Sequence, residues 1–409
     1  MRHALVGLLW RLAVRAEPQL RSLRELVARF LAAFSQVLRA LPGTSWRFGP
    51  PRRLTFDTYG WASGHAAPCR EVDAPWISGR SLPEAAGQIL PHQFTDSLAW
   101  PMPRTFVLTL DDARLWGRDA ITVTADDTVL ADQANAFHLR PEQLAITRRL
   151  WLGSPRRVPG VSATIGGAYA GSYYHWMFDL LPRLDVLRRS GLEFDHLVTP
   201  DSLAYQRETL AVAGVRAEDR ISYTADSFLH TERLLVPSLP GTPGQSPPIV
   251  CQFLRDIFAA QLTGERQGRR LYLSRADTFR RLLANEAAVI AALAALGFES
   301  VTMAGRSVAE QARLFAQAEV VVAPHGGALT NLVFCQPGTK VVELFPPGYT
   351  PVCFWTIALA AGLVYRPVFD DRSPPHARVS QWVPYEIEPS RVLDTLAELG
   401  VETPVVNRS

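Results

Sequence analysis

Three consecutive residues, His325, Gly326 and Gly327, form the strongest candidate for a ligand-binding turn in this sequence of 409 residues. They follow an apolar strand expected over Val320–Ala323 and precede a helix expected over Ala328–Phe334. Glycine lets the backbone approach a ligand closely, and a helix N-terminus presents free N–H groups and a partial positive charge. This arrangement favours a phosphate or diphosphate ligand, with a purely structural turn as the alternative.

Two arginines follow a second expected strand, Arg270–Leu273. Ser274 and Arg275 come directly after this strand, and Arg281 lies in the same loop. A planar guanidinium can pair with two phosphate oxygens at once. The loop is therefore a second candidate for binding a diphosphate.

Glu343 lies near the end of an apolar strand expected over Lys340–Leu344. Open α/β sheets bind ligands at the carboxyl ends of their parallel strands, where a carboxylate can hold the two hydroxyls of a ribose. A solvent-exposed glutamate at a strand exit is the alternative.

Other polar residues in this half of the chain have a structural interpretation. Asn285 is expected to cap a helix over Glu286–Leu296. Ser307 and Glu310 have the spacing of a capping box, which predicts the start of another helix.

A third group of polar residues follows a glycine-rich stretch at residues 166–171. If a helix begins at Ser172, His175 and Asp179 lie one turn apart on the same face, and Arg183 continues that face. A histidine beside a carboxylate can accept a proton during catalysis. Either residue is a candidate for the base, and buried structural roles for both are the alternative.

Strands and helices alternate after about residue 165, which is typical of doubly wound parallel sheets. A stretch rich in proline and glycine, Pro237–Pro248, divides this pattern into two runs. We therefore expect an α/β protein with two Rossmann-like lobes facing a cleft. The expected strands are 196–199, 234–236, 270–273, 300–303, 320–323 and 340–344, and the expected helices are 205–213, 249–262, 286–296, 308–318, 328–334, 352–361 and 390–399.

Five segments are expected along the chain. Residues 1–42 form a basic amphipathic helical extension, and 43–165 an irregular region with a small antiparallel β-unit. Residues 166–245 form the N-terminal Rossmann-like lobe, which contains the candidate base. Residues 246–380 form the C-terminal lobe, which contains the candidate diphosphate-binding loops, and 381–409 a returning helix.

The first 41 residues contain seven arginines and two glutamates, a net charge of +5. Their apolar residues follow a heptad spacing at Leu20, Leu23, Val27, Phe30, Phe34, Val37 and Leu41. Three interpretations are open: packing on the protein's own domain, binding to an anionic membrane surface, or a coiled coil. No apolar stretch is long enough for a spanning helix, and no secretory signal is expected.

The composition is that of an ordinary globular protein, with 47% hydrophobic and 20% charged residues. This balance excludes a disordered chain, and the net charge of +3 does not favour a nucleic-acid partner. The four cysteines (Cys69, Cys251, Cys335 and Cys353) have no metal-ligand spacing and are expected to be reduced apolar fillers.

These motifs occur in an order that resembles glycosyltransferase family 61. The resemblance covers about residues 105–370 and rests on three sequences: Tyr174-His175-Trp176 with Phe178-Asp179-Leu180-Leu181-Pro182; Ser274-Arg275, Arg281 and Asn285-Glu286; and the segment from His325 to Asn331 with Glu343. The family usually has His-Gly-Ala-Gly-Leu at the third motif, whereas Gly327 and Ala328 are exchanged here. Bacterial members are often described as capsular polysaccharide biosynthesis proteins.

The resemblance implies a GT-B fold and an inverting transfer of a sugar from a UDP-sugar to a glycan or lipid-linked acceptor. It assigns His175 or Asp179 as the base, and Ser274, Arg275, Arg281, His325, Gly326, Gly327, Asn331 and Glu343 to the nucleotide-sugar. We expect no metal cofactor, because the Asp-Asp pairs at 111–112, 126–127 and 370–371 form no Asp-X-Asp motif. The expected location is the cytoplasm, with peripheral contact to the inner face of the membrane. A UDP-sugar epimerase and a non-catalytic nucleotide- or glycan-binding protein are the alternatives.

Overall fold

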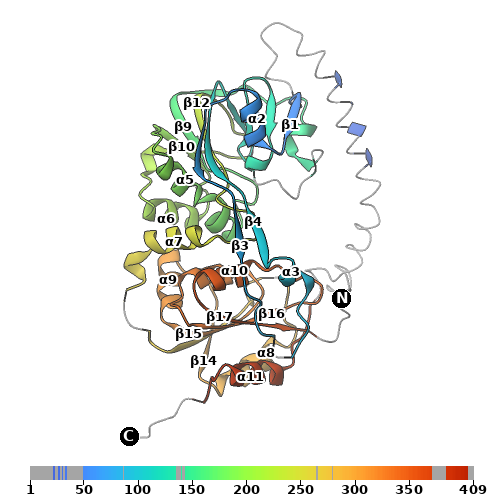
Figure 1. Ribbon diagram of the computed structural model, residues 1–409, viewed down its shortest axis with the longest axis vertical. Coiled ribbons are helices and arrows are strands. Elements are labelled where there is room, and N and C mark those ends of the chain that lie inside the picture. The colour runs from blue at the N-terminus through green and yellow to red at the C-terminus, as the bar shows by residue number, and fades with distance from the viewer. Residues whose placement is uncertain are drawn as a thin grey trace. The chain divides into compact units, whose positions relative to one another are not determined.

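The computed structural model describes residues 49–85, 87–134, 140, 143–263, 266–278, 280–370 and 384–403, with residues 22, 23, 26, 27, 30, 33 and 34 (Figure 1). The chain forms two compact units. Unit 1 comprises residues 1–74 and 104–239, and unit 2 comprises residues 75–103 and 240–409. This division differs from the expected segments, because residues 75–103 belong to unit 2 and residues 104–165 share a unit with residues 166–239.

Unit 1 contains a mixed sheet with a parallel part in the order β12-β9-β10-β11. An antiparallel part continues from β12, which pairs with both β5 and β6. The expected antiparallel β-unit is therefore present, but it is continuous with the parallel strands. The strands are β1 (Arg53–Thr55), β2 (Cys69–Asp73), β5 (Thr105–Asp111), β6 (Arg114–Trp116), β7 (Ile121–Val123), β8 (Thr128–Leu130), β9 (Arg156–Thr164), β10 (His196–Thr199), β11 (Arg220–Ser222) and β12 (Phe228–Pro237).

The helices of unit 1 follow β9 and β10 for the most part. They are α2 (Thr58–Gly64), α4 (Tyr173–His175), a π-helix η4 (Trp176–Leu180), α5 (Arg183–Ser190) and α6 (Ala204–Val212), with short 3₁₀ turns η1 (Asp132–Ala134), η3 (Ala145–Arg148) and η5 (Ala217–Asp219). Gly191 ends α5 in the left-handed conformation (φ 66°), which glycine adopts without the steric cost of a Cβ.

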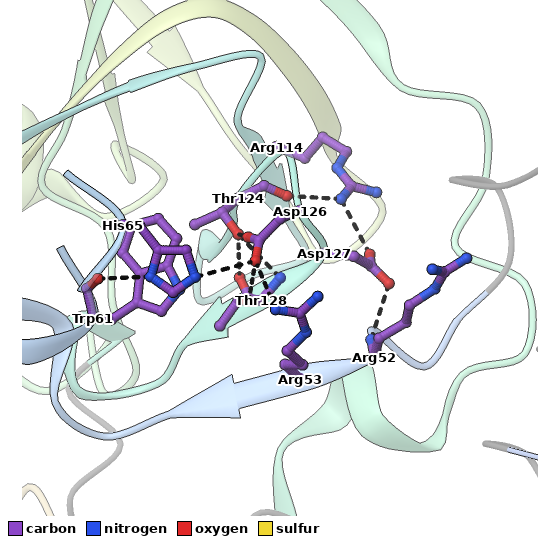
Figure 2. Close-up of polar contacts among 9 residues, drawn as sticks. All are labelled: Arg52, Arg53, Trp61, His65, Arg114, Thr124, Asp126, Asp127 and Thr128. Carbon is purple, nitrogen blue, oxygen red and sulfur yellow. Dashed lines mark hydrogen bonds and ion pairs between the residues drawn. The ribbon is translucent and has the colours of Figure 1, made fainter. Parts of the chain in front are cut away.

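The turn between β7 and β8 is fixed by two aspartates, as Figure 2 shows. Asp126 accepts hydrogen bonds from Thr128 Oγ1 (3.1 Å) and from Arg53 Nη1 (3.2 Å). Asp127 accepts hydrogen bonds from Arg114 Nη2 (3.1 Å) and from the backbone N–H of Arg52 (2.9 Å). These bonds fix the turn and hold the strand β1 against β8.

Unit 2 contains a five-stranded parallel sheet in the order β14-β13-β15-β16-β17. The predicted α/β class with parallel strands is confirmed. The strands are β13 (Arg269–Leu273), β14 (Phe298–Val301), β15 (Ala318–Pro324), β16 (Lys340–Phe345) and β17 (Val364–Phe369); the helices are α7 (Pro248–Ile257), η6 (Ala259–Gln261), α8 (Glu286–Ala294), α9 (Val308–Ala316), η7 (Gly327–Phe334, a 3₁₀-helix), α10 (Cys353–Ala360) and α11 (Pro389–Glu398). Residues 75–103 add a two-stranded ribbon of β3 (Trp76–Gly79) and β4 (Ala99–Met102) and the short helix α3 (His92–Thr95).

One face of the unit 2 sheet packs against α8 and α11, which lie side by side (Figure 1). The core on this face includes Val320, Val322, Val342 and Leu344 from the strands. Side chains alternate between the two faces of a strand, so Glu343 points to the opposite face. The same face carries Tyr365 of β17, whose hydroxyl bonds to Glu343.

The described residues of the N-terminal segment are helical, and their apolar side chains are exposed. Leu23, Val27, Phe30 and Phe34 of the predicted stripe are each at least 41% exposed. Leu20, Val37 and Leu41 lie outside the described residues. Among the described residues, no helix is long and apolar enough to cross a membrane.

Candidate active site

The site in unit 2 lies where the strand order reverses. Counted along the chain from β13, the sheet has the order 2-1-3-4-5, and doubly wound sheets bind ligands at the carboxyl ends of the strands on either side of such a reversal. Here those strands are β13 and β15. Arg275 follows the first, and His325 and Gly326 follow the second. The fold therefore brings the two predicted diphosphate-binding loops together.

Gly326 is required for this close approach. A Cβ built on Gly326 would lie 1.7 Å from Nη1 of Arg275, whereas a Cβ on Gly327 would have no atom within 4 Å. The φ of Gly326 is 175°, an extended value open to any residue, so the requirement is one of space. The exchange of Gly327 and Ala328 relative to the usual family motif therefore leaves the necessary glycine in place.

Arg275 and Arg281 are cations without a carboxylate partner among the described residues. Arg275 Nη2 donates to the backbone carbonyl of Arg280 (2.9 Å), and Arg281 lies 5.4 Å from the ring centre of Tyr349. The Nε atoms of both arginines are buried and make no hydrogen bond to a described residue. Burial and the neighbouring Arg281 lower the pKa of Arg275 to about 10. Two adjacent guanidiniums with unused donors are suited to bind an anion with several oxygens.

The loop after β13 is held by polar contacts of its own. Glu286 accepts hydrogen bonds from the backbone N–H of Arg275 (3.0 Å) and from the hydroxyl of Tyr272 (3.1 Å). The Ser274 hydroxyl accepts from the N–H of Ala276 (3.2 Å). Ser274 and Glu286 thus shape the loop that carries Arg275.

Asn285 and Asn331 have structural contacts. Asn285 occupies the N-cap position of α8, but its side chain makes no capping bond; it donates to the carbonyl of Ile387 (2.8 Å). Asn285 is therefore at the N-cap position as predicted, but the expected capping bond is absent, because its side chain bonds to the backbone of Ile387 instead. Asn331, a predicted site residue, is fully buried and donates to Gln311 Oε1 (2.7 Å). It joins η7 to α9, which begins at the predicted capping box.

That capping box is confirmed in full. The N–H of Glu310 donates to Ser307 Oγ (3.2 Å), and the N–H of Ser307 donates to Glu310 Oε2 (2.7 Å).

His325, Glu343 and Tyr365 form a buried chain of hydrogen bonds. His325 Nδ1 lies 2.5 Å from Glu343 Oε1, and the Tyr365 hydroxyl donates to Glu343 Oε2 at 2.5 Å. Glu343 has no exposed surface, and burial raises its pKa to about 8. Burial and the cations of Arg281 and Arg275 lower the pKa of His325 well below its usual value. The carboxyl group that was expected at the ribose hydroxyls is thus buried, and each of its oxygens bonds to a side chain of the protein.

Tyr365 and Tyr385 belong to this site, and the sequence analysis missed both. Tyr365 lies on β17, a strand that was not predicted; the apolar alternation of residues 364–369 after the helix-ending Gly362 was the available signal. The Tyr385 hydroxyl donates to the carbonyl of Leu344 (3.1 Å), and burial raises its pKa above the usual range. Nothing in the local sequence indicates that contact.

His175 and Asp179 form a second polar pair, in unit 1. His175 Nδ1 lies 2.6 Å from Asp179 Oδ2, as the predicted spacing requires. The carboxylate is almost fully buried, whereas the side chain of His175 is 28% exposed. The helix changes from α to π at Trp176, where the N–H of Leu181 bonds to the carbonyl of Trp176. Such single π turns occur frequently at functional sites.

Arg183 was expected to continue the face of His175, and this prediction is wrong. The side chain is 1% exposed and donates to the carbonyls of Pro237 (2.9 Å), Gly166 (2.7 Å) and Gln133 (3.1 Å). Helical spacing alone could not reveal this role, because the three acceptors come from distant parts of the chain. Arg183 joins the glycine loop, β12 and η1.

Comparison with known proteins shows which family this region matches. Residues 173–342 match the sequence model of the family Glycosyltransferase 61, which confirms the resemblance over a shorter range than the expected 105–370. The chain is 39% identical over 106 residues to a β-1,2-xylosyltransferase of Oryza sativa subsp. japonica, covering 24% of this chain and 18% of that protein. It is 31% identical over 120 residues to the human protein O-linked-mannose β-1,4-N-acetylglucosaminyltransferase 2, covering 27% of this chain and 20% of that protein. The chain thus matches about a fifth of the length of these relatives.

Proposed function

Because residues 173–342 are a Glycosyltransferase 61 domain, we propose that the protein is an inverting glycosyltransferase of the GT-B type that uses a nucleotide-sugar, with UDP as the nucleotide. The observation that carries the donor site is the pair Arg275 and Arg281, whose unused donors lie at the reversal of a doubly wound sheet. His325 and the helix start at Gly327 add further donors there. The acceptor is a glycan or a lipid-linked sugar of surface polysaccharide synthesis.

In the proposed reaction the acceptor hydroxyl attacks C1 of the sugar from the side opposite UDP. The bond between C1 and the phosphate oxygen breaks, and UDP leaves with the electron pair. Negative charge grows on the diphosphate, where guanidiniums stabilise the transition state more than the ground state. His175 takes the acceptor proton at Nε2, while Asp179 holds Nδ1 and fixes the ring.

The proposal is tested by incubating the protein with UDP-sugars in the presence and absence of acceptor glycans. Release of UDP that requires the acceptor supports a transferase. Conversion of the UDP-sugar without any acceptor would instead indicate an epimerase, and saturable UDP binding without turnover a binding protein. A thermal-shift panel of UDP-, GDP-, dTDP- and CMP-sugars identifies the nucleotide.

Substitution of either arginine is expected to weaken UDP binding. Loss of one charged hydrogen bond to phosphate in Arg275→Ala or Arg281→Ala costs about 1.5–3 kcal/mol. Gly326→Ala is expected to have a similar effect, because the new Cβ displaces Arg275 without removing it. Gly327→Ala is the matched control, since its Cβ enters open space. Calorimetric titration with UDP measures all four variants, and wild-type affinity in both arginine variants would overturn the assignment.

Metal-independent turnover is the second expected result. The guanidiniums supply the positive charge that a cation supplies in other transferases, and two of the Asp-Asp pairs are engaged elsewhere: Asp111 binds Arg233, and Asp127 binds Arg114. Activity is therefore expected to survive EDTA. Turnover that disappears on chelation and returns with Mn²⁺ or Mg²⁺ would contradict this.

The N-terminal segment is proposed to bind the anionic inner face of the membrane, where nucleotide-sugars meet lipid-linked acceptors. The net charge of +5 and the exposed Leu23, Phe30 and Phe34 support this. Phe30→Ser/Phe34→Ser is expected to lower co-sedimentation with anionic vesicles. Equal sedimentation of this variant and the wild-type protein would refute membrane contact through this face.

A further inference from the structure

The buried ring of His325 uses only one of its two nitrogens. Nδ1 bonds to Glu343, whereas Nε2 makes no hydrogen bond with any described residue. The ring is 4% exposed and lies among the rings of Phe345, Tyr349 and Phe354, with centroid distances of 5.0–5.4 Å. One ring nitrogen of an almost fully buried histidine is thus left for a partner outside the described residues, which points to a ligand at Nε2.

A neutral His325 can keep its bond to Glu343 as either of two tautomers, which differ in the protonation state of Glu343. An ionised Glu343 would accept from Nδ1–H, leaving Nε2 as an acceptor. A neutral Glu343 would donate from Oε1 to Nδ1, leaving Nε2–H as a donor. Complete burial favours the neutral carboxyl group, and its raised pKa agrees with this. The imidazolium is disfavoured, because burial and the cations of Arg281 and Arg275 lower the pKa of His325 well below its usual value. A phosphate oxygen accepts hydrogen bonds, so of the two neutral tautomers only the second suits an anion beside Arg275 and Arg281.

We propose that Glu343 and Tyr365 are positioning residues that hold His325 as the Nε2–H tautomer, so that this neutral N–H donates to the diphosphate of the bound nucleotide. Tyr365 donates to one carboxyl oxygen and so directs the acid proton to the other, which faces Nδ1. The tautomer follows from these hydrogen bonds alone and is expected in the protein without ligand. The identity of the acceptor as a diphosphate rests on the proposed function.

The tautomer can be measured without any ligand. Long-range ¹H–¹⁵N spectra of histidine-labelled protein distinguish a protonated from an unprotonated ring nitrogen, and His325→Gln assigns the signal by its loss. The expected result at neutral pH is protonated Nε2 and unprotonated Nδ1. A proton on Nδ1 would overturn the proposal even if the protein proves to be a glycosyltransferase.

Binding of UDP and of inorganic pyrophosphate tests the consequence. Glu343→Leu is expected to lower the affinity for both ligands at least about tenfold. Glu343→Gln is expected to retain most of the wild-type affinity, because an amide can donate to Nδ1 and accept from Tyr365. Tyr365→Phe is expected to have an intermediate effect. Glu299→Gln, the same change at the exposed ion pair with Arg269, is the control.

Each result distinguishes this inference from the proposed function. If the Glu343→Gln variant binds UDP and pyrophosphate as weakly as the Glu343→Leu variant, the ionised carboxylate is required and the inference fails, although UDP binding to the wild-type protein stands. If neither UDP nor pyrophosphate binds the wild-type protein, the diphosphate acceptor fails with the proposed function, and the tautomer spectrum still decides how His325 is held.

Discussion

His175→Ala is expected to lower the turnover number by about 10²–10⁴-fold, the usual contribution of a general base, while the Kd for UDP changes little. The reason is the geometry of the pair: Asp179 is almost fully buried and holds Nδ1 at 2.6 Å, and the partly exposed ring keeps Nε2 for the acceptor proton. Steady-state rates with donor and acceptor, together with calorimetric titration of UDP, measure the two quantities separately.

Asp179→Asn separates the two carboxylate roles. If Asp179 only orients the ring, Asp179→Asn is expected to lower the turnover number less than His175→Ala does. An equal decrease in turnover would make Asp179 the base itself. The melting temperature of each variant provides the control for folding. A destabilised His175→Ala protein with wild-type turnover per folded molecule would remove this residue from the mechanism.

Arg183→Met is expected to lower the free energy of unfolding of the protein by about 3 kcal/mol or more. The substitution leaves the buried carbonyls of Pro237, Gly166 and Gln133 without their donor, and each unsatisfied buried acceptor costs about 1–3 kcal/mol. Urea unfolding measures the change.

Arg189→Met on the same helix provides the control for that prediction. Arg189 pairs with Asp73 and Asp185 at the surface and is 31% exposed, so its loss is expected to cost no more than about 1 kcal/mol. Equal stability of the two variants would show that the buried guanidinium does not hold the glycine loop, and would reopen a role for Arg183 in the active site.

Local patterns predicted those parts of the fold that depend on neighbours in sequence. The alternation of apolar strands with capped helices identified β13, β15, β16 and their helices to within a few residues, and the spacing of His175 and Asp179 gave their contact. The strands β9 and β17 were missed, although β17 carries Tyr365.

Contacts between distant residues were not accessible from the sequence. The glycine pattern alone does not show that position 326 must leave space for Arg275, because the two residues lie in loops about 50 residues apart. Glu343 has the same sequence context as an exposed strand-end glutamate, and only the packing of β17 beside β16 shows that it is buried. Residues 75–103 lie between the strands β2 and β5 of unit 1 and yet belong to unit 2, because chain order does not determine which core a segment joins.

A crystal structure of the protein with UDP would show directly whether the loops after β13 and β15 bind the diphosphate. We expect the diphosphate at the carboxyl ends of these two strands, with its oxygens about 2.7–3.2 Å from the guanidiniums of Arg275 and Arg281 and from Nε2 of His325. UDP bound at any other place, with these donors still free of the nucleotide, would contradict this expectation.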